Sequence, residues 1–281
     1  MKKVIITSDG ACDLSKEIIS KYDIKVIPMP ITMGTDSYLD GIDATALDVF
    51  KFFEDTGDLA KSSATPVPTY EQEFKKYLDE GYEVVHIGLS SKLSATFNNS
   101  VLSSEDLEGC YCVDSKNLST GIGLLVIEAA IARDKGMSAA EIAEHVSSLT
   151  KKVSASFVID TLKYMVKGGR CSSVAALGAN MLQLKPCIEV NDGAMSVVKK
   201  YRGKLSACLT SYIKDRLENN DNIDTSRIFV THSHCSPEIV ELVKSEVSKY
   251  KKFDEILETT AGCTISVHCG PNTLGILFFN K

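Results

Sequence analysis

The first half of the chain alternates short apolar runs with segments in which apolar residues recur every three or four positions. Apolar runs over residues 4–7, 84–89 and 110–113 predict β-strands. The recurring pattern predicts helices over residues 13–21, around Phe50 and Phe53, and over residues 71–80, 93–104 and 120–135. Strands that alternate with helices are joined by right-handed crossovers, which favours a mainly parallel sheet.

Two local signals add a helix and an extended segment to this half. Ser138 and Glu141 match the S-x-x-E capping box, which begins a further helix that reaches residue 149. Two prolines within residues 26–31 exclude a helix there, so this segment is predicted to be extended. Residues 1–155 are thus predicted to form an N-terminal α/β domain around a mainly parallel sheet.

The second half follows a different pattern, because it contains a predicted β-hairpin. Asp192-Gly193 lies between the apolar runs 187–190 and 195–200, and Asp-Gly in that place is a strong turn signal. The other predicted elements are strands over 157–160, 227–231, 255–259, 265–268 and 274–279, and helices that end at Gly168-Gly169 or span 172–184, 204–218 and 237–251. Because the strands of a hairpin are antiparallel, residues 156–281 are predicted to form a C-terminal α/β domain with a partly antiparallel sheet.

The composition is that of a soluble globular protein. Of the 281 residues, 44% are hydrophobic and 24% are charged, and the length suits two domains. The net charge of −6 argues against nucleic acid as a partner, because phosphate contacts need a basic surface. The sequence shows neither an export signal nor an apolar run of the roughly 18 residues that span a bilayer, and its nine cysteines are odd in number. We therefore expect a cytoplasmic protein with reduced thiols.

Four segments combine serine and threonine with turn-forming residues. They are residues 7–10, 61–69, 90–96 and 114–123. In a parallel sheet, turns that follow strands gather at the carboxyl edge, where helix N-termini offer free N–H groups to an anion. Hydroxyls also cap helices, and a single segment of this kind would predict nothing more. Four of them predict a site that holds an anion.

Two further segments supply side chains suited to such a site. Gly168-Gly169 permits a sharp turn, and Arg170 after it can make a fork-shaped contact with a carboxylate or a phosphate. His268 lies at the end of a predicted strand, beside a turn at Gly270-Pro271. The alternatives are a glycine C-cap with a solvated arginine and a histidine with a structural role.

Motifs for metal binding and for common enzyme chemistry are missing from the sequence. His232, His234 and Cys235 lack a second ligand pair at zinc spacing. There is no G-x-x-x-x-G-K-[ST] phosphate loop, no G-x-S-x-G elbow and no G-x-G-x-x-G after a strand. No serine has an evident base and orienting partner. The pattern favours holding an anion over breaking a bond, so no metal and no catalytic residue is predicted.

Taken in order, these motifs resemble those of the DegV family, whose best-understood members are the fatty-acid-binding subunits of bacterial fatty acid kinase. The matching stretches are Thr7-Ser8-Asp9 with Cys12-Asp13-Leu14, Ser90-Ser91-Lys92-Leu93-Ser94-Ala95-Thr96, Asp114-Ser115-Lys116, Lys167-Gly168-Gly169-Arg170, Leu184-Lys185-Pro186, Asp192-Gly193, and His268-Cys269-Gly270-Pro271 with Gly275. None of these motifs is specific alone, but their order and spacing over nearly the whole chain are.

The resemblance implies a long-chain fatty acid bound between the two α/β domains, with an apolar tunnel for its acyl chain and no cofactor. Ser62 best matches the family's hydroxyl that holds the carboxylate, with Ser63 as the alternative if the register shifts by one. Ser94 matches the second hydroxyl ligand. Arg170 and His268 match polar residues around the head group and are expected to supply positive potential there.

The resemblance also implies a protein partner. In the family, a separate kinase subunit phosphorylates the bound carboxylate to an acyl phosphate, so the chain itself is expected to be a carrier and not an enzyme. Arg202, within the basic run 199–204, matches an arginine implicated in contact with that kinase. A carrier of this kind also allows transient contact with a membrane. The sequence departs from the family pattern at Gly10, Ala64, Thr65 and Ala95.

Two other interpretations stay open at this point. One is a small-molecule enzyme that uses Ser94 or His268 chemically on a carboxylate or phosphate substrate. The other is an acidic regulatory protein whose pocket is vestigial. For Arg202, the alternative to contact with the kinase is that the run 199–204 is an ordinary solvated charge run.

Overall fold

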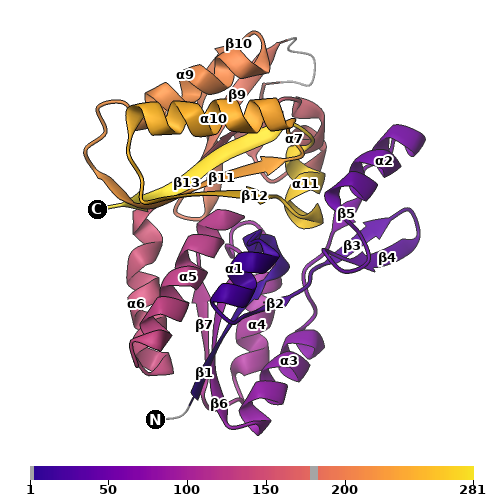
Figure 1. The fold of residues 1–281 in the computed structure, drawn as a ribbon. Helices are drawn as coiled ribbons and strands as arrows, with labels where there is room; N and C mark the ends of the chain where they lie inside the picture. Colours follow the sequence, from indigo (N-terminus) through magenta and orange to yellow (C-terminus); the bar gives the residue numbers. More distant parts are fainter. Residues whose placement is uncertain (1–2, 178–182) are drawn as a thin grey trace.

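The computed structural model describes residues 3–177 and 183–281, and the first half is built on a four-stranded sheet. Its strand order is β2-β1-β6-β7, and every neighbouring pair is parallel. The strands are β1 (Lys3–Asp9), β2 (Ile24–Ile27), β6 (Tyr82–Gly88) and β7 (Cys110–Asp114). The predicted parallel sheet is therefore confirmed, and its carboxyl edge points toward the second half of the chain (Figure 1).

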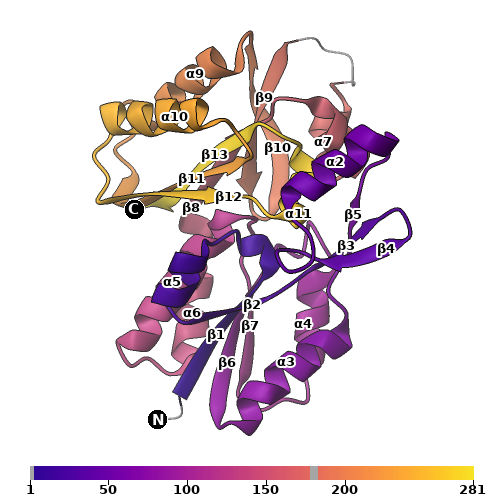
Figure 2. The ribbon, with the colours of Figure 1, turned by 45° about the vertical axis from the view of Figure 1, so that its right-hand side comes forward.

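Helices cover both faces of this sheet (Figure 2). They are α3 (Val67–Asp79) and α4 (Thr96–Ser104) on one face, and α5 (Thr120–Asp134) and α6 (Ala139–Leu149) on the other, with α1 (Lys16–Lys21) and the 3₁₀ turns Gly10–Cys12 and Thr150–Lys152 between elements. Successive residues of a strand face opposite sides. Ile5 accordingly packs with Tyr70 and Phe74 of α3, whereas Ile6 belongs to the core around α5.

The second half is built on a six-stranded sheet of order β10-β9-β8-β13-β11-β12. All of its neighbouring pairs are antiparallel except β11 and β12. The strands are β8 (Val153–Val158), β9 (Leu184–Asn191), β10 (Ala194–Arg202), β11 (Ile223–Ser233), β12 (Glu255–Thr260) and β13 (Thr273–Asn280), and helices α9 (Leu205–Leu217) and α10 (Pro237–Tyr250) pack against one face. The predicted hairpin is β9 and β10, which pair across Asp192-Gly193.

Helix α5 joins the two halves into one core. It contacts β1 and β6 of the first sheet and also β8 and β13 of the second. Eleven of its fifteen residues are buried, so it shows little amphipathic character. A helix that is apolar all round belongs between two layers, and this is the place that α5 occupies.

A third, small sheet was not foreseen from the sequence. It has the order β4-β3-β5 and is antiparallel, and it is covered by α2 (Ala46–Thr56); its strands are β3 (Pro30–Met33), β4 (Asp36–Leu39) and β5 (Lys61–Ser62). The predicted extended segment 26–31 is two strands in different sheets, since β2 ends at Ile27 and β3 begins at Pro30. Proline has no N–H to donate to a ladder, so it suits the first residue of a strand.

The strand predicted over residues 265–268 is wrong, because these residues lie in helix α11 (Cys263–Cys269). The helix is capped from a distance. Asp40 accepts hydrogen bonds from the backbone N–H groups of Cys263 and Thr264, both at 2.7 Å. A cap that comes from more than two hundred residues away leaves no local signal, which explains the error.

The helix predicted over residues 172–184 is also only partly right. It begins at Ser172 as α8 (Ser172–Ala175), but Leu184 is the first residue of β9, and residues 178–182 lie outside the described part of the chain. Before it, α7 (Leu162–Gly168) ends at the predicted glycine pair. The domain boundary at residues 155 and 156 stays a prediction, and β8 runs across it.

Candidate functional site

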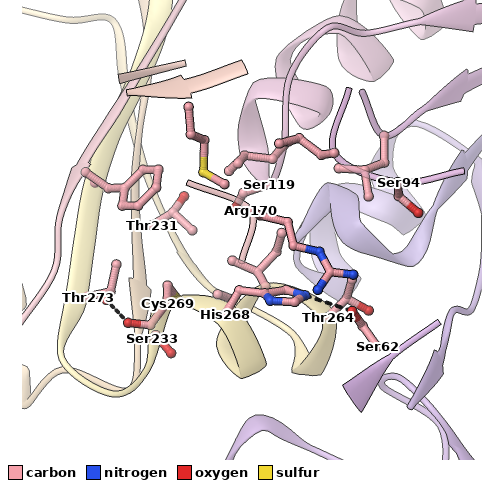
Figure 3. A pocket seen from close by; sticks show the side chains of 18 of the residues that line it. Ser62, Ser94, Ser119, Arg170, Thr231, Ser233, Thr264, His268, Cys269 and Thr273 are labelled. Atoms are coloured by element: carbon pink, nitrogen blue, oxygen red, sulfur yellow. Dashed lines mark hydrogen bonds between the residues drawn. The ribbon is translucent and has the colours of Figure 1, made fainter. Parts of the chain in front are cut away.

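One cavity lies between the two halves of the chain, where the carboxyl edge of the first sheet meets the second sheet and α11. Its wall includes all five residues predicted as ligands, namely Ser62, Ser63, Ser94, Arg170 and His268. Figure 3 labels four of them, all except Ser63. About 900 Å³ of space lies between its atoms, counted out to the open mouth. Little of this space lies clear of the wall atoms, so the cavity is narrow and suits a slender chain better than a ring system.

The rest of the wall is mainly apolar. The apolar side chains come from both halves and are Met29, Leu89, Leu93, Leu118, Phe157, Met165, Met195, Ala261, Ile265 and Leu277. Methionine is unbranched and polarizable, so it adapts to the shape of a neighbour. The hydroxyls of Thr231, Ser233 and Thr273 also line the cavity, but each is already hydrogen-bonded within the protein. The cavity therefore has one polar end and long apolar walls.

Ser62 and His268 form the centre of the polar end. Ser62 ends β5 and His268 lies on α11, and their Oγ and Nε2 atoms are 2.8 Å apart. Burial, with a smaller contribution from the charge of Arg170, lowers the pKa of His268 to about 4. The ring is therefore neutral at pH 7, and in this state it does not supply the positive potential expected of it. If Nε2 carries the ring proton, it donates a hydrogen bond to Ser62 Oγ. The hydrogen of the serine hydroxyl is then free to donate to an incoming anion.

The two glycines before Arg170 serve different purposes. Gly169 has φ +68° and ends α7 in the left-handed conformation that glycine adopts readily. Gly168 is still helical, but a Cβ there would lie 2.6 Å from Nδ1 of His268, so glycine lets α7 approach the ring. Nη1 of Arg170 then donates to the Gly168 carbonyl at 2.6 Å, and the guanidinium points toward His268 (Figure 3).

Ser94 and Ser63 reach the cavity from two other turns. Ser94 lies between β6 and α4, and its Oγ accepts a hydrogen bond from the Thr96 N–H at 3.2 Å. Its own hydrogen is thus free to point at a ligand. Ser63 is exposed, whereas Ser62 before it is half-buried. The burial favours Ser62 as the ligand, and the choice between the two stays a prediction.

Thr264 is a cavity residue that the sequence did not indicate. It lies one helical turn before His268 on α11, so both side chains are on the same face. Its hydroxyl is buried and has no hydrogen-bond partner among the described residues. A buried polar atom without a partner is costly, and a ligand would satisfy it. The predicted strand over 265–268 hid this residue, because only a helix makes positions 264 and 268 neighbours.

A buried network around Asp9 holds the hydroxyl-bearing turns in place. Asp9, at the end of β1, accepts a hydrogen bond from the Leu89 N–H at 2.7 Å and another from the Tyr70 hydroxyl. Oη of Tyr70 is 2.9 Å from Oγ1 of Thr96, which in turn accepts from the N–H of Thr65 at 3.2 Å. The network thus ties the turn that carries Ser94 to the turn that carries Ser62. Tyr70 carries no motif, so sequence reasoning missed this function.

A second buried aspartate, Asp13, orients α11. Asp13 accepts a hydrogen bond from the Gly262 N–H at 2.8 Å, just before the helix, and also contacts the Ser119 hydroxyl. Burial raises the pKa of Asp13 to about 8. Together with Asp40, it anchors the helix that presents His268 to the first half of the chain.

The turns after β6 and β7 also bind the hairpin of the second half. Asp192 accepts from Nζ of Lys92 at 2.8 Å and from Nζ of Lys116 at 3.0 Å. Ser90 Oγ donates to the Gly193 carbonyl at 2.9 Å. We refer to these five residues as the hairpin clasp. Ser90, Lys92 and Lys116 come from two of the predicted hydroxyl-rich segments, and in the clasp they hold the hairpin and do not face a ligand.

Arg202 lies outside the cavity, whereas His232 lines it together with Thr231 and Ser233. Arg202 is the exposed last residue of β10, paired with Leu184, and it does not line the cavity. Nδ1 of His232 accepts a hydrogen bond from the Cys235 N–H at 3.2 Å. Within residues 3–177 and 183–281, no three His, Cys, Asp or Glu side chains are grouped to hold a metal ion, and no helix is long and apolar enough to cross a membrane.

The chain is similar over its whole length to several known proteins. A DegV domain-containing protein of Clostridium perfringens is 31% identical over 291 residues, and each chain is covered in full. A DegV lipid binding protein from Thermotoga maritima is 26% identical, with a TM-score of 0.86 over 99% of this chain and 98% of its own. A stearic acid-binding protein from Eubacterium ventriosum is 25% identical, with a TM-score of 0.83 over 98% of both. A family model described as "Uncharacterised protein, DegV family" matches residues 3–281, and the chain therefore belongs to the DegV family.

Proposed function

We propose that this protein binds a long-chain fatty acid, with the carboxylate at the polar end of the cavity and the acyl chain along its apolar walls. The observation that carries the proposal is a narrow cavity that joins Ser62, Ser94 and His268 to a long apolar lining. The lipid-binding and stearic acid-binding relatives from Thermotoga maritima and Eubacterium ventriosum support it.

The polar end has the donors that a carboxylate needs. With the ring proton of His268 on Nε2, the hydroxyls of Ser62 and Ser94 each keep a hydrogen to donate, and Thr264 adds a third hydroxyl that has no partner among the described residues. Arg170 supplies the positive charge, because His268 is neutral at pH 7. Hydrogen bonds to a charged group contribute about 1.5–3 kcal/mol each.

The acyl chain would contribute most of the affinity. Burying roughly 14–16 methylenes at about 0.8 kcal/mol each gives a term larger than that of the head group, before the cost of ordering the chain. Sequestration inside the protein also keeps the free acid, which is a detergent, out of membranes. The protein is in this view a carrier without a catalytic residue of its own.

The family resemblance supports a finer proposal, that the carrier presents the carboxylate to a separate kinase subunit. The exposed Arg202 on β10 is the residue proposed to contact that subunit. The sequence has no phosphate-binding loop, which is consistent with the nucleotide being held by the partner. If Arg202 lies in that contact, Arg202→Ala should slow acyl-phosphate formation and leave fatty-acid binding unchanged.

Native mass spectrometry tests the main proposal. The purified protein is measured alone and after incubation with C14–C18 fatty acids, and we expect an added mass equal to one fatty acid per chain. A protein that takes up none of them would overturn the proposal. Chemical conversion of the bound acid in the absence of any partner would favour the enzyme interpretation instead.

A further inference from the structure

Two of the nine cysteines differ from the others in exposure. Cys110 and Cys112 are partly exposed, whereas the other seven are buried. Both lie on β7, the edge strand of the first sheet, beside β6. Alternate residues of a strand face the same side, and both side chains accordingly pack against the cluster that includes Tyr70 and Phe74 of α3. Neither lines the cavity of the proposed fatty-acid site, so the proposed function leaves the pair unexplained.

The spacing of the pair permits a disulfide bond that is easy to reduce. Two residues along an extended strand separate Cα atoms by about 6.4–6.8 Å. Disulfides usually join Cα atoms about 4.4–6.8 Å apart, so Cys110 and Cys112 lie near the upper limit of this range. An edge strand can make the small backbone adjustment that closure needs, because one of its sides is not held by a neighbouring strand. A disulfide formed with some strain is reduced readily, which suits a reversible reaction better than a structural bond.

The surroundings of Cys112 make it the more reactive of the two. Its Sγ lies 3.5 Å from the Ser100 carbonyl oxygen and 3.6 Å from Oγ of Ser104, both on α4. His86 of β6 is its register partner in the sheet. The neighbouring thiol of Cys110 and, more weakly, the charge of His86 lower the pKa of Cys112 against the opposing effect of burial. The neighbouring Cys112 and burial raise the pKa of Cys110. Because the thiolate is the nucleophile, Cys112 reacts first and Cys110 second.

The buried cysteines have the opposite character. Burial raises the pKa of four of them to about 12, namely Cys12, Cys187, Cys235 and Cys269. They are therefore thiols at neutral pH, and a thiol shielded from solvent is inert.

The segment before β7 favours a small, uncharged oxidant. Glu105, Asp106 and Glu108 are exposed in the turn that leads into Cys110. Their charges repel an anionic disulfide such as oxidised glutathione. The pair is also only partly exposed, which limits the size of the molecule that can reach it. A hydroperoxide is both small and neutral.

We propose that Cys110 and Cys112 form a site of reversible oxidation, at which one hydroperoxide converts the two thiols to a disulfide. The sulfur of Cys112 attacks the outer oxygen of the hydroperoxide and the O–O bond breaks. The alcohol leaves with the thiol proton, and Cys112 becomes a sulfenic acid. The sulfur of Cys110 then bonds to that of Cys112, the S–O bond breaks, and the hydroxyl group leaves with the proton of Cys110 as water. Two thiols are thus oxidised and one hydroperoxide is reduced to an alcohol and water, and a dithiol regenerates the site.

Mass spectrometry of the full-length wild type tests the proposal. The reduced, folded protein is exposed to a few equivalents of hydrogen peroxide at neutral pH, then unfolded and treated with N-ethylmaleimide. We expect the chain to lose two hydrogens and to carry the label on seven of its nine cysteines, with the peptide that contains Cys110 and Cys112 unlabelled. Dithiothreitol should restore both thiols. This measurement needs no variant, so it does not depend on whether a substituted protein folds.

Three variants assign the order of the two steps. Cys110→Ser cannot form the disulfide, so dimedone should trap a sulfenic acid on Cys112. In Cys112→Ser, oxidation of Cys110 should be at least about tenfold slower than oxidation of the pair in the wild type. Cys208→Ser, which removes a buried thiol from α9, is the matched control and should form the disulfide at the wild-type rate.

The opposite results would overturn the proposal. Both thiols could stay reduced at a peroxide concentration that oxidises free glutathione, and the pair would then not be a redox site. A disulfide between two protein molecules, or a sulfinic acid on Cys112 without a disulfide, would show that the two thiols do not act together. Rapid oxidation of Cys110 in Cys112→Ser would reverse the assigned order. None of these measurements involves a fatty acid, so their failure is distinct from failure of the proposed function.

Discussion

At the scale of single residues, the polar end of the cavity depends on hydroxyls whose hydrogens are left free by their neighbours. Ser94 Oγ accepts from a backbone N–H, and Ser62 Oγ accepts from the neutral His268 when the ring proton is on Nε2, so each hydroxyl can then donate outward. Because these two serines accept hydrogen bonds from the protein, their own hydrogens can point into the cavity as donors.

Replacing these serines tests the assignment directly. Ser62→Ala and Ser94→Ala are each expected to weaken fatty-acid binding by about 10- to 100-fold, because each removes one hydrogen bond to a carboxylate. The double variant should bind more weakly than either single one. Ser248→Ala, at an exposed position on α10, is the matched control. Wild-type affinity in the double variant, measured by fluorescence competition, would place the carboxylate elsewhere.

A second prediction concerns Gly168, which touches His268 and not the ligand. Alanine is a better helix former than glycine, so Gly168→Ala should not weaken α7 itself. Its methyl group would lie 2.6 Å from Nδ1 of His268 and push the ring away from Ser62. We expect about tenfold weaker binding with a thermal midpoint close to that of the wild type. Unchanged affinity would show that the position of the ring does not matter for binding.

At the scale of elements, α11 is the piece of structure on which the site depends. The helix has only seven residues, and its N-terminus is held by Asp13 and Asp40 from the other half of the chain. The side-chain oxygens of both aspartates accept hydrogen bonds from N–H groups at the start of the helix, which would otherwise lack partners. Because Thr264 and His268 lie on this helix, Asp13 and Asp40 position cavity residues although neither aspartate lines the cavity.

The buried state of Asp13 predicts a pH dependence of stability. Its pKa of about 8 in the folded protein lies above its unfolded value near 4, so the folded state holds the proton to higher pH. This contribution is fully present below pH 4 and is lost as the pH rises toward 8. Between pH 5 and 8.5, the thermal midpoint of the wild type should therefore fall more than that of Asp13→Asn, which keeps one donor and one acceptor. Parallel curves for the two proteins would contradict this prediction.

At the scale of the whole molecule, the cavity exists only because two sheets meet across α5. The hairpin clasp is the polar contact that closes this junction beside Ser94. Its two lysines lower the pKa of Asp192 to about 2, so the pair of ion contacts persists through the physiological range. The side chains are exposed, and their effect should thus be on the motion of the hairpin more than on folding.

The clasp predicts a salt-sensitive release rate. Met195 on the same hairpin lines the cavity, so loosening the hairpin should ease the exit of a bound chain. We expect Asp192→Asn to release a fluorescent fatty acid a few times faster than the wild type, in stopped-flow transfer to acceptor vesicles. Salt should accelerate release from the wild type and have less effect on the variant. Asp221→Asn, which removes the same charge from a distant surface pair, should behave as the wild type.

The fold was largely predictable where the signal is local or periodic. The parallel sheet, the hairpin at Asp192-Gly193 and the glycine end of α7 all follow from runs of a few residues. The third sheet was missed because β5 has two residues and β4 is mostly exposed, so neither shows an apolar alternation. The strand predicted at 265–268 failed for a different reason, since the cap that makes it a helix comes from Asp40.

The sequence by itself determined which residue types stand at the ends of the parallel strands, because the alternation of strands and helices sends those ends to one edge. It also indicated Arg170 and His268 as companions, through the family resemblance. Only the tertiary structure decided that Ser62 meets His268, that Thr264 faces the same cavity and that His268 is neutral. These are consequences of burial and of contacts between residues some two hundred positions apart. The hydroxyl-rich segments could thus be recognised in the sequence. Packing decided which of their hydroxyls face the cavity, as Ser62 and Ser94 do, and which bond within the hairpin clasp, as Ser90 does.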